Sequence, residues 1–441
     1  MNVGFVSLGC SKNLVDTEMM IGLFKNNNYD IVNDPKEAEI IIVNTCGFIE
    51  SAKVEAIDTL LEMAEYKKTA RCKYLIATGC LVERYKEELV KEIPEVDAFI
   101  KFSEYDLFWK QIEEVIKDKN NYDNEKLDYN ERFVTTGNNY AYLRVADGCN
   151  NFCTFCAIPY IRGRFRSRRI EDILEEVKKL TKEGIREFII IAQDTTKYGV
   201  DLYNKPMLAE LINEISKIDG VEWIRFLYSY PETITDDLIE VLKNNNKVCK
   251  YLDIPMQHIS NSVLKRMNRK STKESTYKLI EKLRKEIPDI IIRSTLMVGF
   301  PGETEEDFNE LYEFVKWAKF DKLGCFTYSK EEGTVAEKMP DQLKESVKKL
   351  RYNKIMKLQQ SISKENLQRF VGRTFKVLIE DAYVNDENEL YFVGRTYMDV
   401  PEIDGYIYLK GDNQQDKVEL NTFINCEVVE VREYDLIGKI L

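Results

Sequence analysis

The sequence predicts an α/β protein in three parts: an N-terminal open parallel sheet with helices, a central incomplete βα barrel, and a small antiparallel β-barrel. Strand and helix patterns alternate over residues 1–130 and again over residues 135–369, which predicts the first two parts. From residue 370 to residue 441 short alternating strands with turn residues between them predict the third. With 441 residues, the chain is also too long for one hydrophobic core.

The first part contains three apolar, β-branched segments, which is the pattern of buried strands. They cover residues 2–8, 39–45 and 73–78, and helical patterns cover residues 16–24 and 54–64. Buried strands joined through helices predict a parallel sheet with helices on its faces. The polar, aperiodic stretch 118–130 is interpreted as a linker to the second part.

The second part repeats strand and helix until a long predicted helix over residues 341–369. An amphipathic helix is expected over residues 170–180, and strands are expected at 141–145, 187–192, 223–227, 251–254, 291–298 and 324–328. In such a barrel, functional groups collect at the C-terminal ends of the strands. The third part is expected to contain strands at 375–379, 389–393, 405–409 and 426–432.

The composition is that of a soluble protein, with 44% hydrophobic and 32% charged residues. The first residues lack the pattern of a signal peptide, and no apolar run approaches the ~18 residues of a membrane span, so a cytoplasmic location is expected. The ten cysteines are therefore more easily explained as ligands than as disulfides. A single histidine, His258, excludes a His-rich metal site, and a structural role is favoured for it.

The most informative motif is a Cys-x3-Cys-x2-Cys triplet formed by Cys149, Cys153 and Cys156. Thiolates select zinc, copper(I) or iron–sulfur clusters, and a closed zinc site needs four ligands. No fourth Cys or His lies close by, whereas three ligands on a cubane cluster leave one iron open for a small molecule. An iron–sulfur cluster is therefore favoured over a zinc knuckle or an accidental group of thiols.

Three further cysteines, Cys10, Cys46 and Cys80, each follow the carboxyl end of a predicted strand and have an adjacent glycine. These strand ends face one crevice in an open parallel sheet, so the three thiols are expected to meet as a second metal site. The alternative is that they are small buried core residues. Cys72 precedes its strand and is not expected to be a ligand.

Polar residues mark other strand ends of the second part. Gln193 and Asp194 follow one strand, and Arg293 and Ser294 lie in another that leads to a Gly-Phe-Pro-Gly turn over residues 299–302, where a nucleoside could be held. Five arginines follow the triplet, at 162, 164, 166, 168 and 169, and they either bind an anion or form a solvated basic loop.

Taken together, the two cysteine sets and the C-terminal barrel resemble the methylthiotransferase family of radical S-adenosylmethionine (SAM) enzymes over essentially the whole chain. The strings Gly9-Cys-Ser-Lys-Asn-Leu-Val-Asp-Thr-Glu18, Ala192-Gln-Asp-Thr-Thr-Lys-Tyr-Gly199 and Tyr251-Leu-Asp-Ile-Pro-Met-Gln-His258 are similar to its ribosomal-protein branch. The string Tyr328-Ser-Lys-Glu-Glu-Gly-Thr-Val-Ala336 is typical of the family. As in the methylthiotransferases, no Gly-Gly-Glu follows the second barrel strand, where Ala192, Gln193 and Asp194 stand.

The resemblance implies two 4Fe-4S clusters, one on each cysteine set, with Phe155 near the adenine of SAM. Gln193, Arg293 and Ser294 are the further candidate SAM contacts. No side chain is expected to act as an acid or base, because a radical is needed to break an unactivated C–H bond. The first cluster would cleave SAM, the second would hold the sulfur, and the barrel would be a TRAM domain for substrate recognition.

Three functions are weighed: methylthiolation of the β-carbon of an aspartate in small-subunit ribosomal protein twelve, methylthiolation of a tRNA adenosine, and a non-catalytic iron–sulfur protein that binds RNA or the ribosome. Residues 370–441 carry 7 Lys and Arg against 15 Asp and Glu, and this charge suits a basic protein better than RNA. The first function is therefore favoured. A flavodoxin- or ferredoxin-type electron donor is expected, with no membrane partner and with nucleic acid only through the ribosome.

Overall fold

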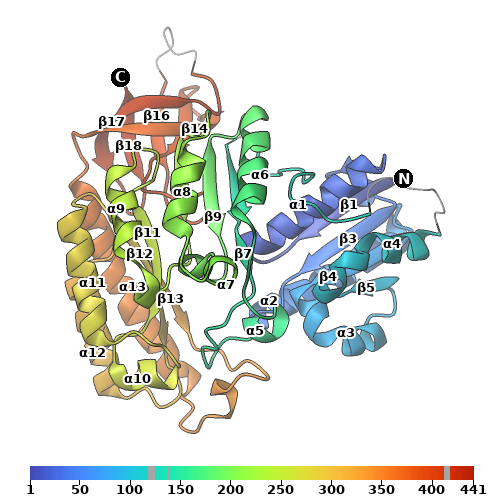
Figure 1. Ribbon diagram of the computed structural model, residues 1–441, viewed down its shortest axis with the longest axis horizontal. Coiled ribbons are helices and arrows are strands. Elements are labelled where there is room, and N and C mark those ends of the chain that lie inside the picture. Colours follow the sequence, from blue (N-terminus) through green and yellow to red (C-terminus); the bar gives the residue numbers. More distant parts are fainter. Residues whose placement is uncertain (118–124, 138, 412–417) are drawn as a thin grey trace.

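The computed structural model describes residues 1–117, 125–137, 139–411 and 418–441. Figure 1 shows a separate N-terminal α/β body, a central array of strands and helices, and a C-terminal barrel at one end of the central array. The predicted linker over 118–130 lies partly outside the described residues, and its described part, 125–130, has no helix or strand. No helix among the described residues is both long enough and apolar enough to cross a membrane.

The N-terminal body is a five-stranded parallel sheet in the order β2-β1-β3-β4-β5, with helices on both faces. Its strands are β1 (Asn2–Ser7), β2 (Asp30–Val32), β3 (Ile40–Thr45), β4 (Tyr74–Gly79) and β5 (Ala98–Ile100), and its helices are α1 (Ser11–Asn26), α2 (Glu50–Thr69), α3 (Cys80–Glu92) and α4 (Phe108–Ile116). Apolar side chains of α2 and α3 pack on one face, and those of α1 and α4 pack on the other. This agrees with the parallel sheet predicted from the buried strand patterns.

The central part contains six parallel strands in two three-stranded sheets, β6-β9-β10 and β11-β12-β13. The strands are β6 (Tyr140–Arg144), β9 (Glu187–Ile191), β10 (Trp223–Phe226), β11 (Tyr251–Gln257), β12 (Ile291–Val298) and β13 (Lys322–Thr327). The predicted barrel is divided because β10 ends at Phe226 and Tyr228 takes a left-handed backbone (φ 64°). The Ile224–Val248 bridge joins the two sheets there, together with the Ser229 amide, which donates to the Asp253 carbonyl 3.0 Å away.

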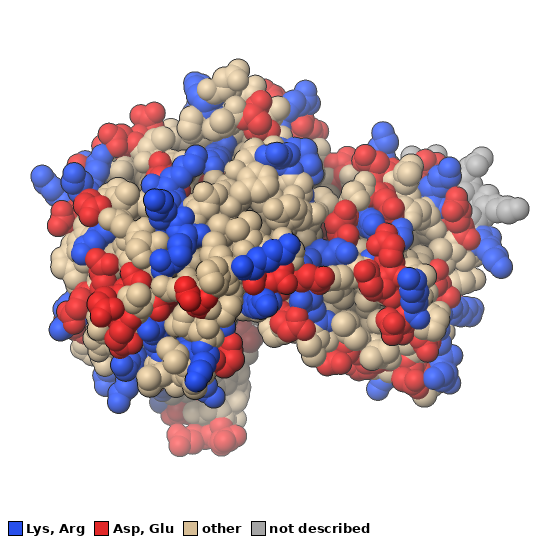
Figure 2. All heavy atoms as spheres, turned by 90° about the horizontal axis from the view of Figure 1, so that it is seen from below, with Lys and Arg blue, Asp and Glu red and all other residues tan. Residues whose placement is uncertain are grey.

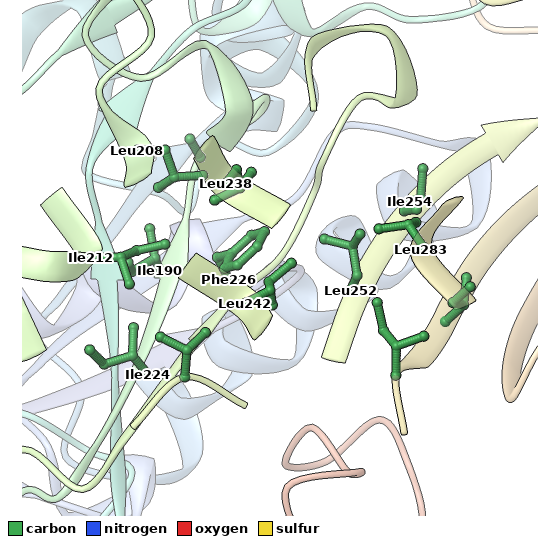
Figure 3. Close-up of a cluster of buried hydrophobic side chains, with 14 of the residues drawn as sticks. Ile190, Leu208, Ile212, Ile224, Phe226, Leu238, Leu242, Leu252, Ile254 and Leu283 are labelled. Atoms are coloured by element: carbon green, nitrogen blue, oxygen red, sulfur yellow. The ribbon is translucent and has the colours of Figure 1, made fainter. Parts of the chain in front are cut away.

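The helices of the central part surround these strands (Figure 1). They are α5 (Ile158–Ile161), α6 (Ile170–Lys182), α7 (Val200–Tyr203), α8 (Leu208–Ser216), α9 (Asp236–Asn244), α10 (Asn261–Arg266), α11 (Lys273–Glu286), α12 (Glu305–Ala318) and α13 (Glu345–Gln368), with the short strands β7 (Ala146–Asp147) and β8 (Arg166–Ser167). Helix α12 begins at a capping box of Thr304 and Asp307, in which aspartate takes the place of the usual Glu or Gln. Figure 3 shows the core between helices and strands, where Phe226 and Ile254 lie among leucine and isoleucine side chains.

The C-terminal part is a closed barrel in the order β14-β15-β16-β18-β17. Its strands are β14 (Thr374–Val384), β15 (Leu390–Arg395), β16 (Ile407–Lys410), β17 (Phe423–Val431) and β18 (Leu436–Ile440). The sequence analysis identified four of them and missed β18, because its Leu-Ile-Gly-Lys-Ile sequence is short and barely alternates. This strand closes the barrel by pairing parallel with β16 and antiparallel with β17.

Buried ion pairs join the three parts. Arg395 of the barrel lies 2.7 Å from Glu187 of β9, and both side chains are fully buried. Arg132 lies 2.7 Å from Glu18 of α1 and 2.9 Å from Glu176 of α6. Breaking such pairs would leave uncompensated buried charge, so these contacts hold the N-terminal body and the barrel against the central sheets.

Candidate functional site

Three cysteines meet at the carboxyl ends of β1, β3 and β4, as the strand pattern predicted. Cys10 precedes α1, Cys46 follows β3, and Cys80 begins α3. Gly9 (φ 89°) allows the close approach, because a Cβ at this position would lie 2.9 Å from the Cys46 Sγ. Cys72 lies outside this group, and its Sγ is 3.5 Å from the carbonyl oxygen of Tyr74.

Asn13, which the sequence analysis did not single out, ties these loops together. Its side-chain amide donates to the carbonyl oxygens of Leu8, at 3.0 Å, and Thr45, at 3.1 Å. Its Oδ1 accepts from Arg162 Nη2 at 2.6 Å and lies 3.6 Å from the Cys80 Sγ. Arg162 follows the second cysteine set in the chain, so this contact connects the two cysteine-bearing loops.

The second set, Cys149, Cys153 and Cys156, lies in the loop between β7 and α5. The segment after α10 supports this loop, because the Asn268 side chain donates to the Phe152 carbonyl at 2.9 Å. Two polar groups also approach the Cys153 sulfur: the Tyr230 hydroxyl at 3.3 Å and the Arg269 Nη1 at 4.0 Å. The sequence analysis missed Tyr230 and Arg269, which come from loops far from the triplet in the chain.

One cavity of about 480 Å³ contains both cysteine sets. Its volume is in the range of small-molecule and cofactor sites. The predicted site residues that line it are Cys10, Cys46, Cys80, Cys149, Cys153, Cys156, Phe155, Gln193 and Arg293. Val400 and Ile403 of the C-terminal part also line it, so all three parts of the chain contribute to this site.

Ser294 is the exception among the candidate SAM contacts. Its side chain is fully buried, and its hydroxyl donates to the Ile254 carbonyl at 2.8 Å inside the sheet. Side chains alternate along β12, so Arg293 faces the cavity while Ser294 faces away. Arg293 pairs with Asp253 at 2.8 Å, and the Gln193 amide donates to Asp147 at 2.9 Å.

The five arginines after the triplet do not act as one group. Arg162 is buried and pairs with Asp16 at 2.8 Å, Arg168 pairs with Glu176 at 2.6 Å, and Arg169 pairs with Asp172 at 2.7 Å. Arg164 and Arg166 are exposed, and Arg164 lies over the Phe152 ring. Arg162 and Arg168 therefore have partners inside the fold, while Arg164, Arg166 and Arg169 are exposed. The five arginines form neither one anion site nor one fully solvated loop.

The thiols of the site differ in acidity. Burial raises the pKa of Cys80 to about 11 and that of Cys156 to about 12, so these thiols lose their proton when a metal takes its place. Burial would also raise the pKa of Cys10, but nearby Lys12 and the backbone amides at the start of α1 outweigh it and lower this pKa. The donor set thus fits iron–sulfur ligation, which requires thiolates.

Each of the two cysteine sets offers three free thiols as possible ligands. Among the described residues, no three His, Cys, Asp or Glu side chains are grouped closely enough to hold one metal ion. Thiolates that ligate different irons of a cluster stand farther apart than the ligands of one zinc ion. Each set thus has the donor type that iron–sulfur clusters take.

His258, the single histidine, does not line the cavity. It is buried, and its Nδ1 accepts from the Ser260 amide at 3.0 Å. Burial lowers its pKa to about 3, so it is neutral near pH 7. It has the structural position that the sequence analysis favoured.

Family models match three separate stretches of the chain. The radical SAM superfamily matches residues 143–315, the uncharacterized protein family UPF0004 matches residues 2–101, and the TRAM domain matches residues 371–441. Each stretch contributes residues to the cavity described above.

Relatives match over the full length. The ribosomal protein uS12 methylthiotransferase RimO of Alkaliphilus oremlandii is 57% identical and covers 100% of this chain and 99% of its own. Proteins of the same name from Clostridium botulinum strain Hall and Acetivibrio thermocellus are 53% and 49% identical and cover 99% and 100% of this chain, and 97% and 98% of their own.

Solved structures share the fold at low identity. The radical S-adenosylmethionine methyltransferase TsrM of Kitasatospora setae matches with a TM-score of 0.55 at 12% identity, over 74% of each chain. The cobalamin-dependent S-adenosylmethionine radical enzyme OxsB matches with a TM-score of 0.51 at 14% identity, over 82% of this chain and 56% of its own.

Proposed function

The chain belongs to the RimO family of ribosomal protein uS12 methylthiotransferases, and on this basis we propose that it adds a methylthio group to the β-carbon of an aspartate in ribosomal protein uS12. The observation that carries the proposal is that both cysteine sets line one cavity. An enzyme that breaks a C–H bond and then delivers sulfur to the same carbon needs both functions at one substrate position.

In this proposal, Cys149, Cys153 and Cys156 hold one 4Fe-4S cluster, and Cys10, Cys46 and Cys80 hold a second. When bound, the clusters and SAM supply the radical, the sulfur and the methyl group. The protein contributes thiolates, position and a largely apolar enclosure, and no side chain is assigned as acid or base. An electron donor of the flavodoxin or ferredoxin type and a cytoplasmic location remain predictions.

The remaining residues orient these groups. Phe155 packs against Phe300, with ring centroids 6.4 Å apart, and presents an aromatic surface to the adenine of SAM. In this proposal Arg293 and Gln193 bind the polar parts of SAM, and their pairs with Asp253 and Asp147 support the two side chains. Ser294 is left out of this set because its hydroxyl is engaged within the sheet.

The substrate assignment is supported by charge. Residues 370–441 carry twice as many acidic as basic side chains, and this acidity disfavours the tRNA alternative because RNA backbones need Lys and Arg. Over the described residues of the face in Figure 2, acidic and basic side chains are interspersed and form no broad basic band. We propose the boundaries 1–130, 135–369 and 370–441 for the methylthiotransferase, radical SAM and substrate-recognition domains.

Mass spectrometry of products tests the proposal. The reconstituted, reduced protein is incubated with SAM, sulfide and either uS12 or tRNA, and the expected result is a gain of one methylthio group on uS12 alone. A gain on tRNA alone would overturn the substrate assignment, and no gain on either would overturn the activity.

A cysteine series tests the two sites separately. Changing Cys10, Cys46 and Cys80 together to Ala is expected to abolish thiolation but to leave reductive SAM cleavage. Cys72→Ala is the matched control, because Cys72 is a buried thiol of the same domain that does not line the cavity. Loss of SAM cleavage in the triple variant with the first cluster intact would contradict the assignment of the two sites.

A further inference from the structure

Lys12 is a buried lysine in the cavity wall that lies near the Cys10 thiol and pairs with no carboxylate among the described residues. Its side chain lines the cavity, and the residue is only 7% exposed. Across the described ranges, its ammonium group has no carboxylate within salt-bridge distance. The buried acids nearby are committed elsewhere: Asp16 pairs with Arg144 and Arg162, and Asp253 pairs with Arg293.

This position is unfavourable for a cation unless something negative joins it. Lys12 lies in the first turn of α1, where the helix dipole repels positive charge. A buried ammonium also loses its hydration. The Tyr228 ring offsets part of this cost, because its centroid lies 3.2 Å from the Lys12 Nζ, and Tyr228 is held by its amide donating to Asp253 at 2.9 Å.

The location identifies where the missing partner would lie. Lys12 follows Cys10 by two residues, and Tyr228 stands at the end of β10, beside the cavity wall that contains the second cysteine set. Lys12 and Tyr228 therefore line the same cavity as both cysteine sets. Other cations of the wall are already engaged: Arg162 and Arg293 pair with carboxylates, and Arg269 donates to the Pro255 carbonyl.

We propose that Lys12 binds the side-chain carboxylate of the target aspartate and so places its β-carbon between the two cysteine sets. This inference rests on the proposed function. The β-carbon of aspartate is bonded directly to the carboxylate, so a cation that holds the carboxylate also fixes the reacting carbon. A substrate without a carboxylate, such as an adenosine, would leave the ammonium unpaired, so Lys12 would also contribute to specificity.

The test measures binding of uS12 to the reconstituted, unreduced holoenzyme, in which no turnover occurs. Calorimetry compares uS12 with its Asp→Asn variant on the wild-type protein and on Lys12→Met, which keeps the length and removes the charge. The wild type is expected to prefer the aspartate form by roughly ten- to a hundredfold, and Lys12→Met is expected to bind both forms equally. Lys12→Arg keeps the charge and should retain part of the preference.

Lys53→Met is the matched control, because Lys53 is a partly buried lysine of the same domain that pairs with Glu50 and Glu331. It should keep the full preference. If Lys12→Met retains the aspartate preference, or weakens SAM binding instead, the ammonium serves another anion and the inference is wrong. The variants are compared at equal iron content. A wild type that methylthiolates uS12 but does not prefer its aspartate form would refute carboxylate binding by Lys12 and leave the proposed function intact.

Discussion

Replacing Asp16 with Asn should destabilise the junction between the N-terminal body and the central part. The Asp16 carboxylate is fully buried and lies 2.6 Å from Arg144 and 2.8 Å from Arg162, whose side chains are 3% and 2% exposed. Among the described residues, the change leaves Asp147 as the one carboxylate near the two buried guanidinium groups, 3.9 Å from Arg144 and 3.4 Å from Arg162. Removing one partner of a buried ion pair costs about 3–5 kcal/mol of unfolding free energy.

Urea unfolding followed by circular dichroism would measure this loss, taken from the first transition because the chain has several parts. Asp172→Asn is the control. It breaks the pair with Arg169, in which the side chains are 44% and 68% exposed, and such pairs contribute under about 1 kcal/mol. A loss in Asp16→Asn no larger than in Asp172→Asn would refute the reasoning that this buried pair joins the two parts.

Three further predictions concern the cluster, the buried histidine and the barrel. Tyr230→Phe removes the hydroxyl 3.3 Å from the Cys153 sulfur, and we expect it to lower the midpoint potential of the first cluster, because hydrogen bonds to ligand sulfur favour the reduced state. A redox titration followed by electron paramagnetic resonance measures this potential, and an unchanged or raised value would contradict a hydrogen bond from Tyr230 to the sulfur. Burial lowers the pKa of His258 to about 3, so this residue stays neutral in the folded protein, whereas in the unfolded chain it binds a proton below its ordinary pKa of about 6.5. The free energy of unfolding therefore falls as the pH falls from about 6.5 towards 3. In urea unfolding, His258 should account for a loss of about 2 kcal/mol of unfolding free energy between pH 6.5 and pH 5, and His258→Asn should lack this loss. If the wild type and His258→Asn lose stability in parallel as the pH falls, the prediction is wrong. Replacing the exposed barrel acids Asp386, Glu387 and Glu430 with Lys should raise the dissociation constant for uS12 several-fold at low salt. Unchanged binding at low salt would contradict the proposal that the acidic barrel binds a basic protein.

The local pattern of apolar and polar residues was sufficient to predict most of the strands and the positions of the cysteine ligands. Buried strands read as continuous apolar runs, so the parallel sheets and the places where Cys10, Cys46 and Cys80 follow their strands were predictable. Because parallel strands share one carboxyl edge, strand position alone predicted that these three thiols meet. The spacing of Cys149, Cys153 and Cys156 was equally informative, because ligands within a segment of eight residues must lie near one another.

Other features depended on the tertiary structure, because they join residues that are distant in the chain. No local pattern could place both cysteine sets on one cavity, or bring Tyr230 and Arg269 to the Cys153 sulfur. The orientation of Ser294 followed from the pleat of β12, and the closure of the barrel followed from pairing of the weakly patterned β18. Lys12 shows the reason most clearly: a sequence records a charge, but only the packed structure decides whether that charge has a partner.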